Sequence, residues 1–433
     1  MAINPDQDVT STIFALSSGA PPAGIGVIRI SGPSAGAALK ALAGELPTAR
    51  RARLTLLTDP QDGSALDRAL VLWLPGPATA TGEDVAELHC HGGRAVVAAV
   101  EEALGRLPGL RHAGPGDFTR RAFENGRIDL NEVEGLSDLL GAETQQQRRS
   151  ALMMAEGHFS RSIAKWQGML LDLSAMAEAA LDFSDEDDVP DSGIEARIAD
   201  GISELSGEVR KLLHAPSAER LRDGIRVVLA GPPNAGKSTL LNALVGRDAA
   251  IVSDIAGTTR DRIEVPAAVA GTAFLFTDTA GLRDDSSDMI EVVGMDRARA
   301  AVEAADILLW LGPKEQIPRE DAILLAAQCD REMAKEGLRV SAVTGEGMDA
   351  LIALLLERAE SLLPATGDYA LHDRQRRGIA SLLEHVQAAD RADDLLIVAE
   401  ELRRARDEID RLTGRASTED MLDRLFAGFC IGK

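Results

Sequence analysis

A glycine-rich segment in the middle of the chain carries the residues with the plainest chemistry. Residues 231–238 read GPPNAGKS, which matches the pattern GxxxxGK[ST] between an apolar run and a helical pattern. Glycines in such a loop let backbone amides point at phosphates, and the helix start adds the positive end of its dipole. Lys237 would reach the terminal phosphates, and the Ser238 hydroxyl would ligate magnesium. The segment predicts a nucleoside triphosphate site.

A second motif further along the chain supports this prediction. Residues 278–281, DTAG, follow the apolar run 273–276, where a strand would deliver Asp278 to the magnesium shell and the Gly281 amide to the terminal phosphate. Residues 257–261, GTTRD, lie between the two motifs. Together these residues resemble the switch GTPases, in the form seen in the bacterial TrmE-Era-EngA-type subfamily of ribosome-assembly and tRNA-modification GTPases.

The resemblance implies two cation sites. It makes Thr259 the second magnesium ligand beside Ser238. It also implies a potassium ion that supplies the positive charge otherwise given by an arginine finger. Asn234 is the expected side-chain ligand of that ion, and the alternative is an Asn that only stabilises the turn. The backbone oxygens expected to complete the potassium site belong to Ser253, Ile255 and Thr258.

Two residues are expected to take part directly in hydrolysis. Leu282 stands where many switch GTPases have a glutamine that orients the attacking water, so water must be positioned in another way. The resemblance assigns this task to Glu291, although a glutamate on a helix surface is the alternative. Lys237 would stabilise charge on the phosphates.

The base-recognition motif Asn-Lys-x-Asp is replaced by Ala327-Gln328-Cys329-Asp330. Asp330 retains the capacity to accept two hydrogen bonds from guanine, whereas Ala327 has no carboxamide and Gln328 covers the base less well than a lysine stem. We expect a preference for GTP with weakened affinity, or a base site completed by other residues. The residues expected to bind GTP are Asn234, Ala235, Gly236, Lys237, Ser238, Thr239, Ser253, Asp254, Ile255, Ala256, Gly257, Thr258, Thr259, Asp278, Thr279, Ala280, Gly281, Asp330, Ser341, Ala342 and Val343.

Motifs in the N-terminal third and at the C-terminus restrict the resemblance to one family. Residues 26–32 read GVIRISG, residues 81–93 read TGEDVAELHCHGG, and residues 115–130 read PGDFTRRAFENGRIDL. The chain closes with Phe-Cys-Ile-Gly-Lys at 429–433. These motifs resemble the MnmE (TrmE) family of bacterial tRNA uridine-5-carboxymethylaminomethyl modification GTPases over essentially the whole chain.

The family resemblance implies a folate site in the N-terminal third. Its contacts match Arg29, Glu87, Arg127 and Lys433, which would hold a tetrahydrofolate derivative in its 5-formyl or methylene form. A carboxylate suits the donor edge of a pterin ring, and Arg or Lys suits its glutamate tail. The alternative for Arg29 and Glu87 is a structural ion pair at a strand edge.

Cysteine and histidine residues complete the candidates. Cys430 is either a reactive or folate-adjacent thiol or a small apolar packing residue. His89 and His91 alternate along one strand but lack an evident third ligand, which argues against zinc. His91 is expected beside the folate pocket.

Three domains are needed to position these residues. Strand patterns over 12–16, 24–30, 69–74 and 85–91, alternating with helical patterns, predict an N-terminal α/β domain over 1–124. The family resemblance implies that this domain binds tetrahydrofolate and dimerises. Helical periodicity predicts a discontinuous all-α domain over 125–217 and 366–433. Strand signals return between them at 225–230, 272–277, 306–311, 322–326 and 338–341, so a P-loop GTPase domain of α/β type is expected over 218–365. The predicted fold is multidomain, with α/β and all-α parts.

Composition excludes several classes of protein. The 433 residues carry 46 Lys and Arg against 69 Asp and Glu, a net charge of −23, so the chain offers no broad basic face for nucleic acid. Three scattered cysteines argue against a disulfide framework. The sequence contains no long uncharged apolar stretch, so no membrane span is predicted. We expect a cytoplasmic protein that meets tRNA through a partner.

The resemblance implies a GTP-hydrolysing subunit that adds a carboxymethylaminomethyl or aminomethyl group to the wobble uridine, as a homodimer in a heterotetramer with FAD-containing MnmG (GidA). A ribosome-assembly GTPase is the first alternative, but it predicts a basic RNA-binding appendage. A regulatory GTPase that binds GTP without turnover is the second, suggested by Ala327 and Gln328.

Overall fold

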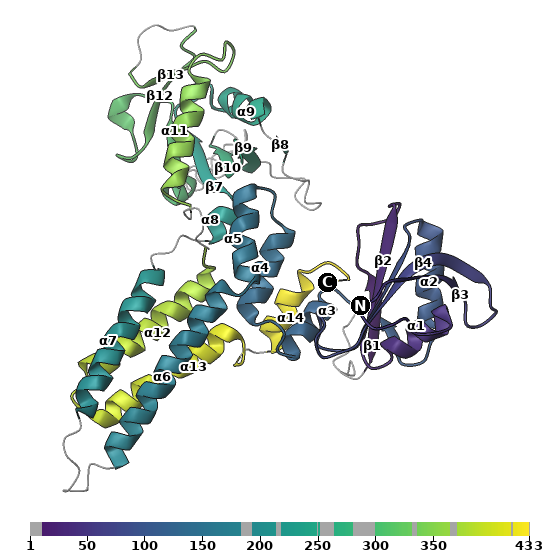
Figure 1. The fold of residues 1–433 in the computed structure, drawn as a ribbon. Helices are drawn as coiled ribbons and strands as arrows, with labels where there is room; N and C mark the ends of the chain where they lie inside the picture. Colours follow the sequence, from purple (N-terminus) through teal and green to yellow (C-terminus); the bar gives the residue numbers. More distant parts are fainter. Residues whose placement is uncertain are drawn as a thin grey trace, which may run out of the picture. The chain divides into compact units, whose positions relative to one another are not determined.

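The computed structural model describes residues 11–182, 193–213, 218–248, 250–251, 264–279, 299–330, 336–363, 370–416 and 419–432. The chain forms two compact units, Met1–Val133 with Thr413–Lys433, and Glu134–Leu412. Figure 1 shows their helices and strands. Within the described residues, no helix is long and apolar enough to cross a membrane.

The first unit is built on a six-stranded sheet in the order β3-β4-β5-β2-β1-β6. Its strand pairs are antiparallel except for β1 with β6. The sequence patterns predict four of these strands and do not predict the two edge strands, β3 and β6. The strands are β1 (Thr12–Leu16), β2 (Ile25–Ser31), β3 (Arg53–Thr58), β4 (Ala65–Leu74), β5 (Val85–His91) and β6 (Leu110–His112).

Helices cover the two faces of this sheet unequally. Helices α1 (Ala35–Ala43) and α2 (Arg94–Gly105) bury their apolar stripes with Phe14, Ile28 and Leu88 in one core. On the opposite face, Phe118 of α3 (Asp117–Glu124) packs with Ile13 and Ala15 of β1. Apolar burial of this kind is the main stabilising term of the unit.

The end of the chain packs within the first unit. Helix α14 (Glu419–Ala427) contacts α3, with the rings of Phe123 and Phe426 6.2 Å apart. Ile431 forms a β-bridge with Pro115. The helical periodicity predicts that residues 366–433 belong to the helical domain as one block. The structure divides that block and groups residues from 413 onward with the N-terminal sheet.

The helices of the second unit bury a shared apolar core. Helices α6, α7, α12 and α13 supply most of it, including the indole of Trp166. Figure 1 shows these helices running side by side. Helix α4 leads into this unit from the first. The helices are α4 (Leu130–Leu140), α5 (Gln145–Ala155), α6 (His158–Asp182), α7 (Ile194–Leu213), α12 (Asp373–Arg391) and α13 (Leu395–Thr413).

A seven-stranded sheet is inserted between α7 and α12, in the order β13-β12-β11-β7-β10-β9-β8. The five strands from β13 to β10 are parallel, so their carboxyl ends meet at one edge. Helices α9 and α11 pack on one face. The elements are α8 (Ala218–Arg222), β7 (Ile225–Ala230), α9 (Lys237–Asp248), β8 (Ala250–Ile251), β9 (Glu264–Val269), β10 (Thr272–Asp278), β11 (Ile307–Trp310), η1 (Lys314–Gln316), β12 (Ile323–Ala327), β13 (Leu338–Val340) and α11 (Met348–Glu360).

This architecture confirms the predicted fold class of α/β parts combined with a helical part. The patterns do not predict β8 and β9, because β8 has two residues and β9 contains Pro266 and two alanines, which give weak strand signals.

Candidate functional site

The loop between β7 and α9 is shaped to hold phosphate. Gly231 and Gly236 adopt φ values of 151° and 90°, and Asn234 adopts 62°. A side chain at Gly231 would lie 3.1 Å from the backbone of Leu311, so glycine is needed there for space as well as for conformation. Helix α9 begins at Lys237 and presents the positive end of its dipole to the loop.

The ammonium group of Lys237 lies inside this loop. The residue is 5% exposed, and its Nζ donates hydrogen bonds to the carbonyl oxygens of Gly231 (3.0 Å) and Pro232 (2.9 Å). These bonds compensate the cost of burying the charge. The group is therefore positioned where the terminal phosphates of a nucleotide would bind.

Two of the expected magnesium-site residues meet at the same sheet edge. Asp278 ends β10 opposite Leu229 of β7, and the Ser238 hydroxyl donates a hydrogen bond to its carboxylate. The next residue, Thr279, is tied to the Leu229 carbonyl through its hydroxyl at 2.9 Å. The arrangement brings two hard oxygen donors together beside the phosphate loop.

The loop after β12 forms one side of a pocket of about 440 Å³ that also includes Gly236 of the phosphate loop. Asp330 accepts a hydrogen bond from the Ser341 hydroxyl at 2.7 Å, so the Asp is held by the loop expected beneath the base. The pocket lining is Gly236, Thr239, Leu240, Ala327, Gln328, Asp330, Val340, Ala342 and Val343. The expected base-loop residues Asp330, Ala342 and Val343 thus share one cavity with the start of α9.

Gln328 makes a contact that the sequence did not reveal. Its Nε2 donates a hydrogen bond of 3.2 Å to the backbone oxygen of Asn234 in the phosphate loop. The sequence motif predicts only that Gln328 covers the base less well than a lysine stem. The only indication in the sequence is that Gln328 directly follows a buried strand. The hydrogen bond itself cannot be predicted from the sequence, because it joins two loops that meet only in the folded chain.

Several expected site residues lie outside the described residues. They are Ser253, Asp254, Ile255, Ala256, Gly257, Thr258, Thr259, Ala280, Gly281, Glu291 and Lys433.

On the N-terminal sheet, three polar side chains form a row on the face opposite α1 and α2. Arg29 of β2 and Glu87 of β5 are direct cross-strand partners, with guanidinium nitrogens 3.1 Å from Glu87 Oε1. His89 Nε2 lies 3.2 Å from the other carboxylate oxygen. The Arg29 guanidinium lies 5.9 Å from the Phe118 ring centroid. We call this row the Arg29–Glu87–His89 row.

The other N-terminal candidates have different surroundings. His91, expected beside the folate pocket, pairs with Asp67 at 2.7 Å. Arg127 is exposed, and its Cγ lies beside Gly82. Cys430 is exposed, so it does not pack as a small apolar residue. Among the described residues, no cluster of three or more His, Cys, Asp or Glu could hold a metal ion.

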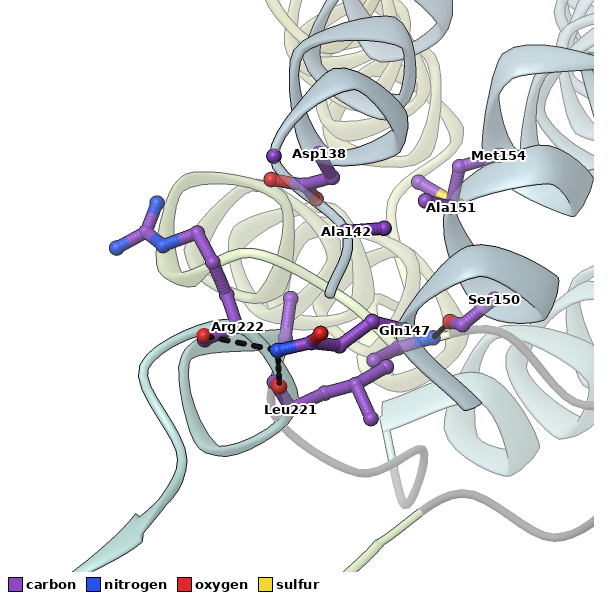
Figure 2. A pocket seen from close by; sticks show the side chains of 11 residues that line it. Asp138, Ala142, Gln147, Ser150, Ala151, Met154, Leu221 and Arg222 are labelled. Carbon is purple, nitrogen blue, oxygen red and sulfur yellow. Dashed lines mark hydrogen bonds between the residues drawn. The ribbon is translucent and has the colours of Figure 1, made fainter. Parts of the chain in front are cut away.

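Both segments that join the nucleotide-binding sheet to the helices are held by α5. Gln147 Nε2 donates to the carbonyls of Leu221 (2.9 Å) and Arg222 (3.2 Å) on the entering segment. The Ser150 hydroxyl accepts from the Ala370 amide (3.0 Å) on the leaving segment. Figure 2 shows these bonds around a pocket of about 340 Å³.

An ionisable group adjoins this junction. His372 Nε2 lies 2.8 Å from a carboxylate oxygen of Asp138 on α4. Burial alone would lower the pKa of His372. The hydrogen bond to Asp138 and the charges of Asp138, Glu134 and Glu219 outweigh burial and raise that pKa. The junction therefore favours the charged imidazolium.

Comparison with known families agrees with the motifs. A family model described as "MnmE helical domain" matches residues 130–430, and one described as "GTP-binding protein TrmE N-terminus" matches residues 12–127. Similar proteins named tRNA modification GTPase MnmE come from Rhizorhabdus wittichii (58% identical, covering 99% of this chain and 98% of that protein) and Zymomonas mobilis (52% identical, 98% and 100%). The solved G domain of the T. maritima FeoB iron transporter covers 31% of this chain and 98% of its own, at 24% identity and a TM-score of 0.24, too low to bear on the fold.

Proposed function

The chain belongs to the MnmE family of tRNA modification GTPases, and from this premise we propose that it hydrolyses GTP as one subunit of an enzyme that modifies carbon five of the wobble uridine in tRNA. The group added is carboxymethylaminomethyl or aminomethyl, with its one-carbon unit drawn from a tetrahydrofolate. One observation carries the GTPase part: Lys237, Ser238 and Asp278 converge at the carboxyl ends of β7 and β10.

The phosphate loop can act with little rearrangement. Lys237 would exchange its two loop carbonyls for phosphate oxygens and stabilise negative charge there. The Ser238 hydroxyl and the Asp278 carboxylate fit magnesium because both are hard oxygen donors that already touch. Magnesium, once bound, would neutralise charge on the phosphates. Thr259 is the further ligand that we propose for it.

Potassium is proposed as the second cation, with Asn234, Ser253, Ile255 and Thr258 as its ligands. Asn234 adopts a left-handed conformation in the phosphate loop and is exposed, so its side chain is accessible to a cation bound beside the phosphates. We expect phosphate release from GTP to be faster in potassium than in sodium at matched ionic strength. Equal rates would remove the potassium site from the proposal, and Glu291 would remain the proposed water-positioning residue.

The folate part of the proposal is supported by the Arg29–Glu87–His89 row. Glu87 is partly buried, with 17% of its side chain exposed, and its two oxygens face different partners. Such a carboxylate can accept hydrogen bonds from the donor edge of a pterin ring. Arg127 and Lys433 are the proposed contacts for the glutamate tail, and Cys430 is an accessible thiol nearby in sequence.

A homodimer is proposed through the same sheet. Leu54 and Leu56 of β3 and Leu70 of β4 are 61%, 46% and 38% exposed, and Leu54 pairs directly with Leu70. Exposed leucines grouped on an edge strand and its neighbour are typical of a protein contact surface. An FAD-containing MnmG partner would bring most of the charge that binds tRNA, because this chain is acidic.

Nucleoside analysis tests the proposed function. Transfer RNA from cells lacking the gene should lose the carboxymethylaminomethyl or aminomethyl group at the wobble uridine, and the gene should restore it. A restored strain carrying Lys237→Ala should not recover the modification. If the modification persists without the gene, the proposed role in tRNA is wrong.

Mass spectrometry of the purified chain should detect a bound reduced folate, and affinity purification should recover a flavoprotein.

A further inference from the structure

One wall of the nucleotide pocket consists of small apolar side chains at the ends of β12 and β13. Ala327 is the last residue of β12 and pairs with Val340 of β13 in the parallel register. Ala327 is 8% exposed and Val340 is 1% exposed, and both line the pocket of about 440 Å³. A methyl group and a valine side chain donate no hydrogen bond. This stretch of wall therefore offers a base apolar contact only.

The polar side chains that line the pocket belong to its other parts. Asp330 is held by a hydroxyl from the loop after β13, and a carboxylate accepts hydrogen bonds without donating any. Gln328, the neighbour of Ala327, already donates to the Asn234 carbonyl of the phosphate loop. Thr239 lies in the first turn of α9. The methyl group of Ala327 is therefore on the phosphate-loop side of the base loop.

The two edges of a guanine base require different partners. Its N1 and 2-amino groups are donors, whereas N7 on the opposite side of the base is an acceptor. The Asp330 carboxylate suits the donor edge. N7 belongs to the five-membered ring, which also carries the ribose and the phosphates, so this ring is directed toward the phosphate loop. Ala327 is the wall residue on that side, and it has no donor for N7.

We propose that Ala327 is a specificity-determining residue, whose methyl group leaves N7 without a side-chain partner, so that the site accepts 7-deazaguanine nucleotides as readily as guanine nucleotides. Selection by side chains then depends on Asp330, which reads the N1 and 2-amino donors. This inference rests on the GTPase function proposed above. It defines a substrate range that is tolerant at position 7 of the base and strict at the donor edge.

Competition of diphosphates against a fluorescent GDP on the full chain is the test. 7-Deaza-GDP differs from GDP only by a C–H group in place of N7, so the native chain should bind the two within about twofold, since no hydrogen bond is lost. Inosine diphosphate lacks the 2-amino group and leaves an oxygen of Asp330 without its donor. It should bind at least about tenfold more weakly than GDP.

Variants at position 327 test the assignment to this residue. Ala327→Asn places a carboxamide donor in the wall and should create a preference for GDP over 7-deaza-GDP of about five- to tenfold, the effect of one hydrogen bond. Ala327→Ser supplies a smaller donor and should change the preference in the same direction. Ala322→Asn makes the same substitution directly before β12, at the opposite end of that strand, and should leave the native ratio unchanged.

The outcomes separate this inference from the function on which it rests. If the native chain binds no GDP, the GTPase function itself is wrong. If the native chain binds GDP and prefers it to 7-deaza-GDP by more than twofold, N7 has a partner and the inference is wrong. If both variants at position 327 bind GDP with the native ratio, Ala327 does not determine the preference, which would also overturn the inference. The comparison on the native chain is decisive even where a variant fails to fold.

Discussion

Replacing Gln147 by Glu should loosen the segment that enters the nucleotide-binding domain without removing the cap of α5. Gln147 Oε1 accepts hydrogen bonds from the amides of Glu143 and Thr144 at 2.8 Å each. Its Nε2 donates to the Leu221 and Arg222 carbonyls. A glutamate retains the accepting oxygen and suits the same position of a capping box. It has no donor for the two carbonyls at neutral pH.

The expected effect follows from these two bonds. Each is worth about 1 kcal/mol, so the free energy of local opening should fall by about 2 kcal/mol. Gln147 is 7% exposed, so water can replace the two lost hydrogen bonds only in part. The adjoining pocket of about 340 Å³ gives water access to the carbonyls, which argues against a larger figure. Amide exchange in the segment should accelerate about 30-fold.

Hydrogen exchange followed by mass spectrometry is the assay. The informative amides belong to Ala218, which donates to Leu371, and Asp223, which donates to Glu219. Gln145→Glu adds the same charge at an exposed position of the same helix and serves as the control. Native-like exchange over residues 218–225 in Gln147→Glu would refute the reasoning, because it would show that the two donated bonds do not hold the segment.

Three further predictions address other sites. Lys237→Met should reduce GTP turnover by about 100-fold or more, because the buried ammonium is lost from the phosphate loop, and steady-state phosphate release measures it. Gly432→Ala should detach the end of the chain, because the new Cβ would lie 2.2 Å from the Leu16 carbonyl oxygen, and faster amide exchange over 426–432 would show it. His372→Asn should flatten the pH dependence of stability. The raised pKa of His372 gives a stabilising contribution that is complete below pH 6.5 and is lost as pH rises through the folded-state value, which urea titrations at several pH values can measure.

The sequence predicts those parts of the sites that depend on local patterns. The phosphate loop follows from the spacing of Gly231, Gly236 and Lys237, because one turn between a strand and a helix determines the geometry. Alternation along two strands also predicts that Arg29 and Glu87 share a face, and the antiparallel register makes them direct partners.

Contacts between distant segments are not available from such patterns. Residues after 413 show a helical periodicity that would suit packing on any apolar surface. The sequence therefore does not predict that α14 packs on α3. In the structure, Arg120 of α3 pairs with Asp423 at 2.6 Å and also with Glu419, and its guanidinium lies 5.9 Å from the Phe426 ring centroid. These contacts join residues about 300 positions apart. The Gln328 contact was hidden for the same reason.

The junction beside α5 bears on how a nucleotide could influence the helices. A flexible linker would transmit little, because its ends move independently. Here the entering and leaving segments are bonded to one helix, and they are bonded to each other through the Ala218 amide and the Leu371 carbonyl at 3.0 Å. A displacement of one segment therefore strains the other and α5 together. We therefore expect a change at the phosphate loop to reach the helical core through α5, and Gln147→Glu should uncouple the two while leaving GTP binding intact.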